Sequence, residues 1–144
     1  MQAGLLTSVK GMWLENINIR GEEISQLSLP TFDTVYLYSL SGDISQLLPL
    51  ISCHKLDIVG TNLSRNDTDS LVKCLYTNVS QLWLWGNINV DIFVLSQYNG
   101  TGKCELVKCS DGSYRRYRGQ VTQWAHNMGW KVDYGAVGMT ITRH

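Results

Sequence analysis

Several features that would indicate a particular chemistry are absent from this 144-residue sequence. Lysine plus arginine and aspartate plus glutamate number 12 each, so no overall field attracts nucleic acid or an acidic membrane. No apolar run approaches the roughly 20 residues that span a bilayer. The start, MQAGLLTSVKG, lacks the basic segment and long apolar block of a secretory leader. We therefore expect a soluble protein without membrane insertion, whose partner is selected by local features.

Groups that would support catalysis or metal binding are also scarce. The three histidines fall beside a predicted strand (His54), on a predicted helix (His126) and at the last position (His144), where they cannot easily meet. No nucleophile motif or phosphate-binding glycine loop occurs. The four cysteines show no Cys-x-x-Cys spacing, which argues against zinc, and we expect buried, reduced thiols. We expect no enzymatic activity, no cofactor and no metal.

Two opposing signals bear on the compartment. The missing leader and the expected reduced thiols favour the cytoplasm. Four sequences match the N-glycosylation pattern Asn-x-Ser/Thr and favour the alternative, a secreted protein or the extracellular part of a larger receptor. They begin at Asn62, Asn66, Asn78 and Asn99.

A pattern of core positions at i, i+2 and i+5 recurs along the chain. It is clearest at Gln81 to Asn87, QLWLWGN, where Leu82 and Leu84 point to one side of a strand and the two tryptophans point to the other. The six copies are Met12, Leu14, Ile17; Val35, Leu37, Leu40; Leu56, Ile58, Thr61; Leu82, Leu84, Asn87; Cys104, Leu106, Cys109; and Val132, Tyr134, Val137. Copies begin 21 to 28 residues apart, and self-similarity at such a period predicts a solenoid.

Helices are expected between these strands. The predicted segments are the end of a helix over residues 1–9, a short helix over 22–29 stopped by Pro30, an irregular one over 43–52 interrupted by Pro49, a helix over 67–76 capped by Asn66, and a helix over 113–128 closed by Gly129. For residues 90–95 the pattern leaves helix and extended chain open. Residues 1–144 then form one domain of five to six repeats, with a parallel sheet on the concave face and helices or irregular segments outside. A start within a repeat favours a fragment of a longer array, or a natural cap.

This organisation resembles the leucine-rich repeat family. The resemblance is carried by the LxLxxN-like cores, above all Leu82-Trp-Leu-Trp-Gly-Asn87, and by the SLVKCL helix of residues 70–75. The subclass is the longer one of ribonuclease inhibitor and the sensor regions of NOD-like receptors. The resemblance implies a receptor that binds microbial or immune ligands.

One basic run, Tyr114-Arg-Arg-Tyr-Arg118, interleaves arginine with aromatic residues and suggests a weaker alternative, nucleic-acid binding. On a helix Arg115 and Arg118 share a face while Arg116 diverges. A solvated outer face is therefore the favoured interpretation, and nucleic acid is an unlikely partner.

The strand face opposite the core is the predicted binding surface. Its i+1 column is Trp13, Tyr36, Asp57, Trp83, Glu105 and Asp133, and its i+3 column is Glu15, Tyr38, Val59, Trp85, Val107 and Gly135. Lys55, Lys103 and Lys131 are expected beside the acids. Contiguous exposed rings usually mark a contact surface, although they also pack on one another simply to stabilise a sheet. We expect Trp13, Glu15, Tyr36, Tyr38, Asp57, Trp83, Trp85, Glu105 and Asp133 to bind a protein, peptide or glycan. The main alternative is a structural or autoinhibitory segment of a larger receptor.

Overall fold

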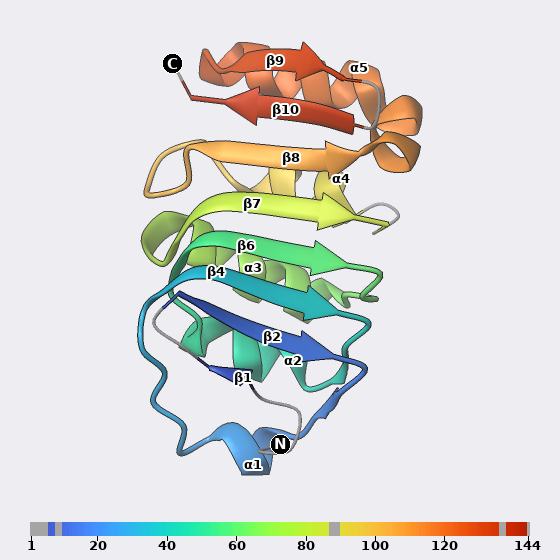
Figure 1. The fold of residues 1–144 in the computed structure, drawn as a ribbon. Coiled ribbons are helices and arrows are strands. Elements are labelled where there is room, and N and C mark those ends of the chain that lie inside the picture. Colours follow the sequence, from blue (N-terminus) through green and yellow to red (C-terminus); the bar gives the residue numbers. More distant parts are fainter. Residues whose placement is uncertain (1–5, 8–9, 87–89, 136–137, 144) are drawn as a thin grey trace.

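The computed structural model describes residues 6–7, 10–86, 90–135 and 138–143. Within these ranges eight strands form one mostly parallel sheet, and helices cover one of its faces (Figure 1). The strands, in their order across the sheet, are β1 (Leu6–Thr7), β2 (Gly11–Glu15), β4 (Phe32–Tyr38), β6 (Cys53–Val59), β7 (Val79–Trp85), β8 (Leu106–Ser110), β10 (Gly138–Thr142) and β9 (Lys131–Tyr134). β3 (Asn18–Ile19) and β5 (Ser41–Gly42) form a separate pair. The protein is thus a mixed α/β fold, as predicted.

The helices connect successive strands on the core side of the sheet. They are α1 (Gly21–Ile24), α2 (Ile44–Leu47) followed by a 3₁₀ turn (Leu48–Leu50), α3 (Arg65–Thr77), α4 (Val90–Gln97) and α5 (Asp111–Met128). α3 begins with a capping box in which Ser64 accepts from Asp67 N–H and Asp67 accepts from Ser64 N–H. The predicted cap, Asn66, instead lies inside the first turn, because Ser64 has the extended backbone that a cap requires.

Other helix predictions are confirmed or corrected. Pro49 shortens the second helix to one turn plus a 3₁₀ turn, as expected. The helix predicted over 22–29 ends already at Ile24, and the stretch predicted as ending a helix near residue 9 contains β1, which pairs antiparallel with β2. Residues 90–95 are helical, and Gly129 follows α5 with a positive φ of 72°.

Four strands have the predicted parallel register. Met12 faces Val35, Val35 faces Leu56 and Leu56 faces Leu82, and the second core positions follow in the same way. All of these side chains are at most 2% exposed, so the predicted inner face is confirmed for β2, β4, β6 and β7. The residue after each of these strands has a left-handed backbone: Asn16, Ser39, Gly60 and Gly86.

The register predicted for the fifth strand is wrong. Leu82 faces Val107, Leu84 faces Cys109 and Trp83 faces Lys108. Cys104 is buried but precedes β8, because its N–H donates to Leu75 O and the next N–H donates to Ser80 O. Val107 therefore lies in the core and not on the open face. Leu106 points the other way, and Glu105 falls before the strand.

The sixth predicted strand is not the parallel neighbour of the fifth. β10 lies between β8 and β9 and runs antiparallel to both. Gly135 N–H donates to Gly138 O beside the paired strands, and Met139 and Ile141 of β10 are fully buried, whereas Tyr134 of β9 is not. β9 is left at the edge with Tyr134 40% exposed, which corrects its predicted core position. Asn87 and Val137 lie outside the described residues.

The C-terminal strand is fixed by one guanidinium group. Arg143 Nη2 donates to the carbonyl oxygens of Gly102 at 2.8 Å and Cys104 at 2.6 Å, and its guanidinium lies 5.4 Å from the Trp130 ring centroid. These contacts join the end of β10 to the loop before β8.

Leu84→Ala tests the inner face. Leu84 is 2% exposed, and its truncation is expected to lower the free energy of unfolding by about 2 to 5 kcal/mol. Urea unfolding followed by circular dichroism measures the loss. A loss within the range of ordinary surface substitutions, about 0.5 kcal/mol, would contradict the buried assignment.

Candidate functional site

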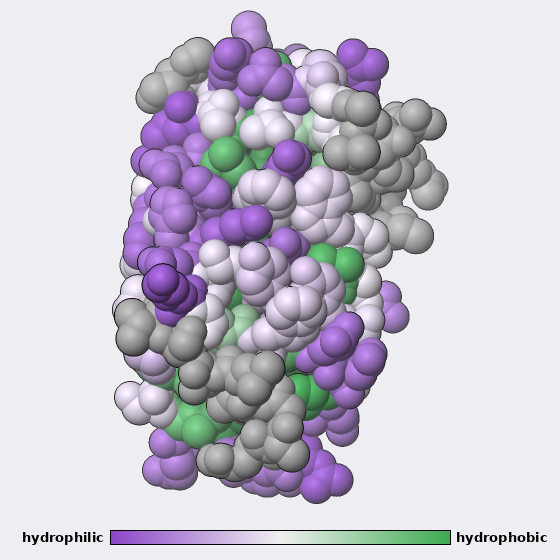
Figure 2. Space-filling model, in the orientation of Figure 1, coloured by the Kyte–Doolittle hydropathy of each residue, from purple (hydrophilic) through white to green (hydrophobic). Residues whose placement is uncertain are grey.

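The sheet face opposite the helices, here called the front face, gathers the predicted aromatic residues. The strand register aligns one row of side chains across this face: Trp13, Tyr36, Asp57, Trp83, Lys108, Thr140 and Asp133. A second row contains Glu15, Tyr38, Val59 and Trp85. Figure 2 shows this face with pale, ring-bearing side chains in the middle and hydrophilic side chains along its margin.

Two groups of rings lie on the front face. Trp13, Tyr36 and Tyr38 form the N-terminal ring cluster, with ring centroids 5.2 to 6.0 Å apart. Trp83 and Trp85 form a pair with centroids 6.0 Å apart. Trp13 remains 46% exposed although it packs on both tyrosines. Rings that contact each other and still face outward provide an amphipathic surface.

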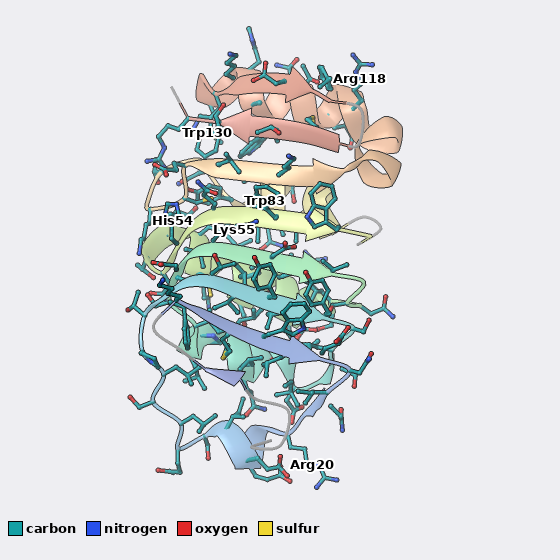
Figure 3. All side chains as sticks on the ribbon, in the orientation of Figure 1. Arg20, His54, Lys55, Trp83, Arg118 and Trp130 are labelled. Carbon is teal, nitrogen blue, oxygen red and sulfur yellow. The ribbon has the colours of Figure 1, made fainter. Side chains whose placement is uncertain are left out.

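Lysines lie against the central tryptophan. Lys55 Nζ is 3.6 Å from the Trp83 ring centroid, and Lys108 Nζ is 4.6 Å from it. The two lysines come from β6 and β8, the strands on either side of β7, and Figure 3 shows Lys55 beside Trp83 on the front face. Such contacts hold an ammonium group over the negative face of the ring.

Asp57 is the unusual residue of this face. It is only 7% exposed, and its Oδ1 has no hydrogen-bond donor among the described residues. Burial raises the pKa of the Asp57 carboxyl above its usual value, and the nearby Lys55 charge only partly opposes this shift. Trp83, its cross-strand neighbour, has a buried Nε1–H without an acceptor in the described part of the chain. A donor and an acceptor are therefore both unsatisfied on adjacent strands.

The structure brings together most, but not all, of the predicted site residues. Glu15 is exposed at the end of β2, and Asp133 lies at the far end of the first row, 3.7 Å from Lys131 Nζ. Glu105 belongs to neither row, because the fifth strand begins after it. Lys103 lies in the loop before β8 and not in the row of Lys55.

Two residues of the row were missed from sequence. Lys108 and Thr140 face the front because their neighbours Val107, Cys109, Met139 and Ile141 are buried. The sequence signal for Lys108 was the alternation of apolar, charged and apolar residues at 107–109. The prediction instead took Cys104 and Leu106 as the core positions of this strand. Recognising it required knowing where the preceding loop ends.

The alternative basic site is only partly described. Arg118 is exposed, and its guanidinium carbon lies 4.1 Å from the Tyr134 ring centroid on the helix side of β9. The side chains of residues 115–117 lie outside the described set. Arg118 therefore packs against the sheet edge through an aromatic contact.

Features of a metal site or of a membrane-spanning helix are absent from the described ranges. No group of three or more His, Cys, Asp or Glu side chains is placed there to hold a metal ion. Among the same residues, none of the helices combines the length and the apolar character needed to cross a bilayer. The four cysteines are buried and free of disulfides, and burial raises the pKa of Cys53 to about 12 and of Cys74 to about 11.

No family model, curated protein or solved structure matches the chain. The geometry of the front face is therefore the basis on which a function is proposed.

Asp57→Asn tests the cost of the buried carboxyl. Native Asp57 holds its proton to a higher pH than the unfolded form, whose pKa is about 3.9, so this group lowers stability as pH rises through that interval. The neutral amide should raise the thermal unfolding midpoint at pH 7, and the difference should shrink at pH 3, where both forms of Asp57 are protonated. Calorimetry at the two pH values measures it. An equal difference at both would show that the charge is not its cause.

Proposed function

We propose that this protein is a non-catalytic binding module that recognises a ligand on a protein, peptide or glycan through the front face of its sheet. The proposal is supported by one observation above all. Five aromatic side chains remain on this face in two contacting groups, and Trp13 is nearly half exposed. Exposed contiguous aromatic surface is uncommon on proteins that bind nothing, and tryptophan and tyrosine dominate interface hot spots.

A leucine-rich repeat solenoid is the architecture we propose for this module. Its support is the common register of β2, β4, β6 and β7 and the left-handed residue that closes each of them. In such an array the front face is concave, which suits a ligand that lies across several strands. A role as receptor segment follows from the resemblance and stays a prediction.

Trp83→Ala tests the proposed function when paired with Leu84→Ala. The Trp83 ring lies outside the core, so its loss should leave stability nearly unchanged and weaken binding by about 2 kcal/mol or more. Binding of the labelled wild type to arrays of glycans and peptides first identifies a ligand. Titration calorimetry then compares the affinity of the variants for that ligand. Tyr134→Ala is the control, because it removes an exposed aromatic ring that does not belong to the front-face rows. Equal loss of binding in that control, or none in Trp83→Ala, would defeat the proposal.

A structural or autoinhibitory segment remains the rival. It predicts that the isolated chain binds no array probe but is bound by other segments of the same polypeptide. Binding of such segments that survives Trp83→Ala would favour the rival.

A further inference from the structure

The centre of the front face is rich in hydrogen-bond donors. Lys55 and Lys108 both place Nζ within 4.6 Å of the Trp83 ring centroid, from strands on opposite sides. Within the described residues neither ammonium group has a carboxylate oxygen within 4.0 Å. The buried Trp83 Nε1–H adds a third donor without an acceptor. The two ammonium groups and the N–H of the ring itself are three donors in one place, and they match a ligand that carries an anionic group.

An acid in the same row of the front face has an unsatisfied oxygen atom. Asp57 is the cross-strand neighbour of Trp83, yet its Oδ1 accepts no hydrogen bond from the described residues. An unsatisfied acceptor beside unsatisfied donors calls for a group that both donates and accepts. A hydroxyl does both through one oxygen atom.

The ring cluster beside this centre adds a shape requirement. Tyr36 and Tyr38 lie on β4, next to β6, and Trp13 lies on β2 beyond it; the two tyrosine rings are nearly parallel, with 6° between their planes. Flat C–H faces pack well on such rings. Lys55 also lies 5.9 Å from the Tyr36 ring centroid, so it spans the space between the ring cluster and Trp83.

From these three requirements we propose that Lys55, Trp83 and Lys108 form an anion-binding subsite for an acidic saccharide, one that bears carboxylate or sulfate groups. The inference rests on the proposed function and names its ligand class. The anion binds the two ammonium groups, a hydroxyl donates to Asp57 and accepts from Trp83 Nε1–H, and a sugar face packs on the tyrosines. In this arrangement Lys55 leaves the Trp83 ring for the anion, and Asp57 Oδ1 and Trp83 Nε1 become accessible to the ligand. An acidic peptide supplies the anion but lacks adjacent hydroxyls and flat C–H faces.

Four hexameric probes separate the ligand classes. They are an oligosaccharide containing glucuronic acid, a sulfated oligosaccharide, a neutral N-acetylglucosamine oligomer and hexaglutamate. Titration calorimetry is run with the wild type and with Lys55→Met plus Lys108→Met, which removes both charges and keeps the apolar stems. We expect the wild type to bind an acidic saccharide and the double variant to bind it about a hundredfold more weakly, since each lysine charge contributes about tenfold to the affinity. Lys103→Met is the control and should bind like the wild type.

The outcomes distinguish the subsite from the proposed function. If the neutral oligomer binds as tightly as the acidic ones and the lysine changes have no effect, the anion assignment is wrong while front-face binding stands. If only hexaglutamate binds, the saccharide class is wrong. No binding to any of the four overturns the subsite. If binding survives both Trp83→Ala and Tyr36→Ala, the front face itself is excluded.

A separate observation concerns the outer edge of β9. Gly135 N–H donates to Gly138 O and Arg143 N–H donates to Glu105 O, which fixes the alternation of hydrogen bonds on both sides of β10. By that alternation the backbone of Lys131 and Asp133 faces β10, and that of Val132 faces outward. Within the described residues no strand pairs with this outer edge.

The side chains of this edge are complementary to themselves. Lys131 and Asp133 lie two apart on the front face, about 60% exposed, on either side of Val132. When two such strands pair antiparallel about Val132, its N–H and C=O bond to their counterparts, and Lys131 of each strand faces Asp133 of the other. A pairing centred on Lys131 or Asp133 would instead place like charges opposite each other, which is destabilising.

We infer that a second copy of this chain pairs at β9 and extends the sheet across a two-fold axis. Sedimentation velocity over a concentration series tests this on the full chain. Lys131→Asp and Asp133→Lys should each weaken the dimer, and the double exchange should restore it because the charges become opposite again. A wild type that stays monomeric throughout the series, or a dimer unaffected by either single reversal, would overturn the inference.

Discussion

Alternation of side chains in four parallel strands of common register is the constraint on which the structure depends. Leu82 and Leu84 are buried because they face the helices, and Trp83 and Trp85 face outward for the same reason. A slip of one residue would exchange the two faces of a strand. The core therefore determines which rings reach the surface, and each new strand adds its rings beside those of the strand before it.

The sequence was informative where two leucine-like residues flank one outward residue. In β2, β4, β6 and β7 only one alternation is available, so the core and the open face were predicted correctly. In β8 two alternations overlap, Cys104 with Leu106 and Val107 with Cys109, and the choice depends on hydrogen bonds from the preceding loop to Leu75 and Ser80. These contacts join residues distant in sequence, and no local pattern contains them. The position of β10 between β8 and β9 also depends on tertiary packing. β9 comes first in the chain, but β10 buries more apolar surface and therefore pairs with β8.

Asp57 is a residue of the candidate site that lowers the stability of the fold. Its position in the outward row was predicted from spacing, but its burial was not, because burial on this face depends on the neighbouring strands, whose Tyr36 and Trp83 face Asp57 in the register. A carboxyl that is buried and lacks a donor to Oδ1 lowers stability, as the raised pKa indicates. The burial of neighbouring leucines offsets the free-energy cost of this carboxyl. Unfavourable polar groups of this kind are concentrated at binding sites, where a ligand completes their hydrogen bonds.

Local charge matters more here than the balanced total. Twelve basic and twelve acidic residues cancel over the chain, yet two lysines without carboxylate partners among the described residues meet at one tryptophan. Pairing at β9 would double this feature in a particular way. A two-fold axis perpendicular to the sheet keeps both front faces on the same side, so two anion subsites would lie on one continuous sheet. A repeating acidic polymer would then bind the second subsite at a high effective concentration after the first, whereas a short oligosaccharide would gain nothing. A preference for long chains over short ones is therefore the property that would connect the subsite to the sheet edge.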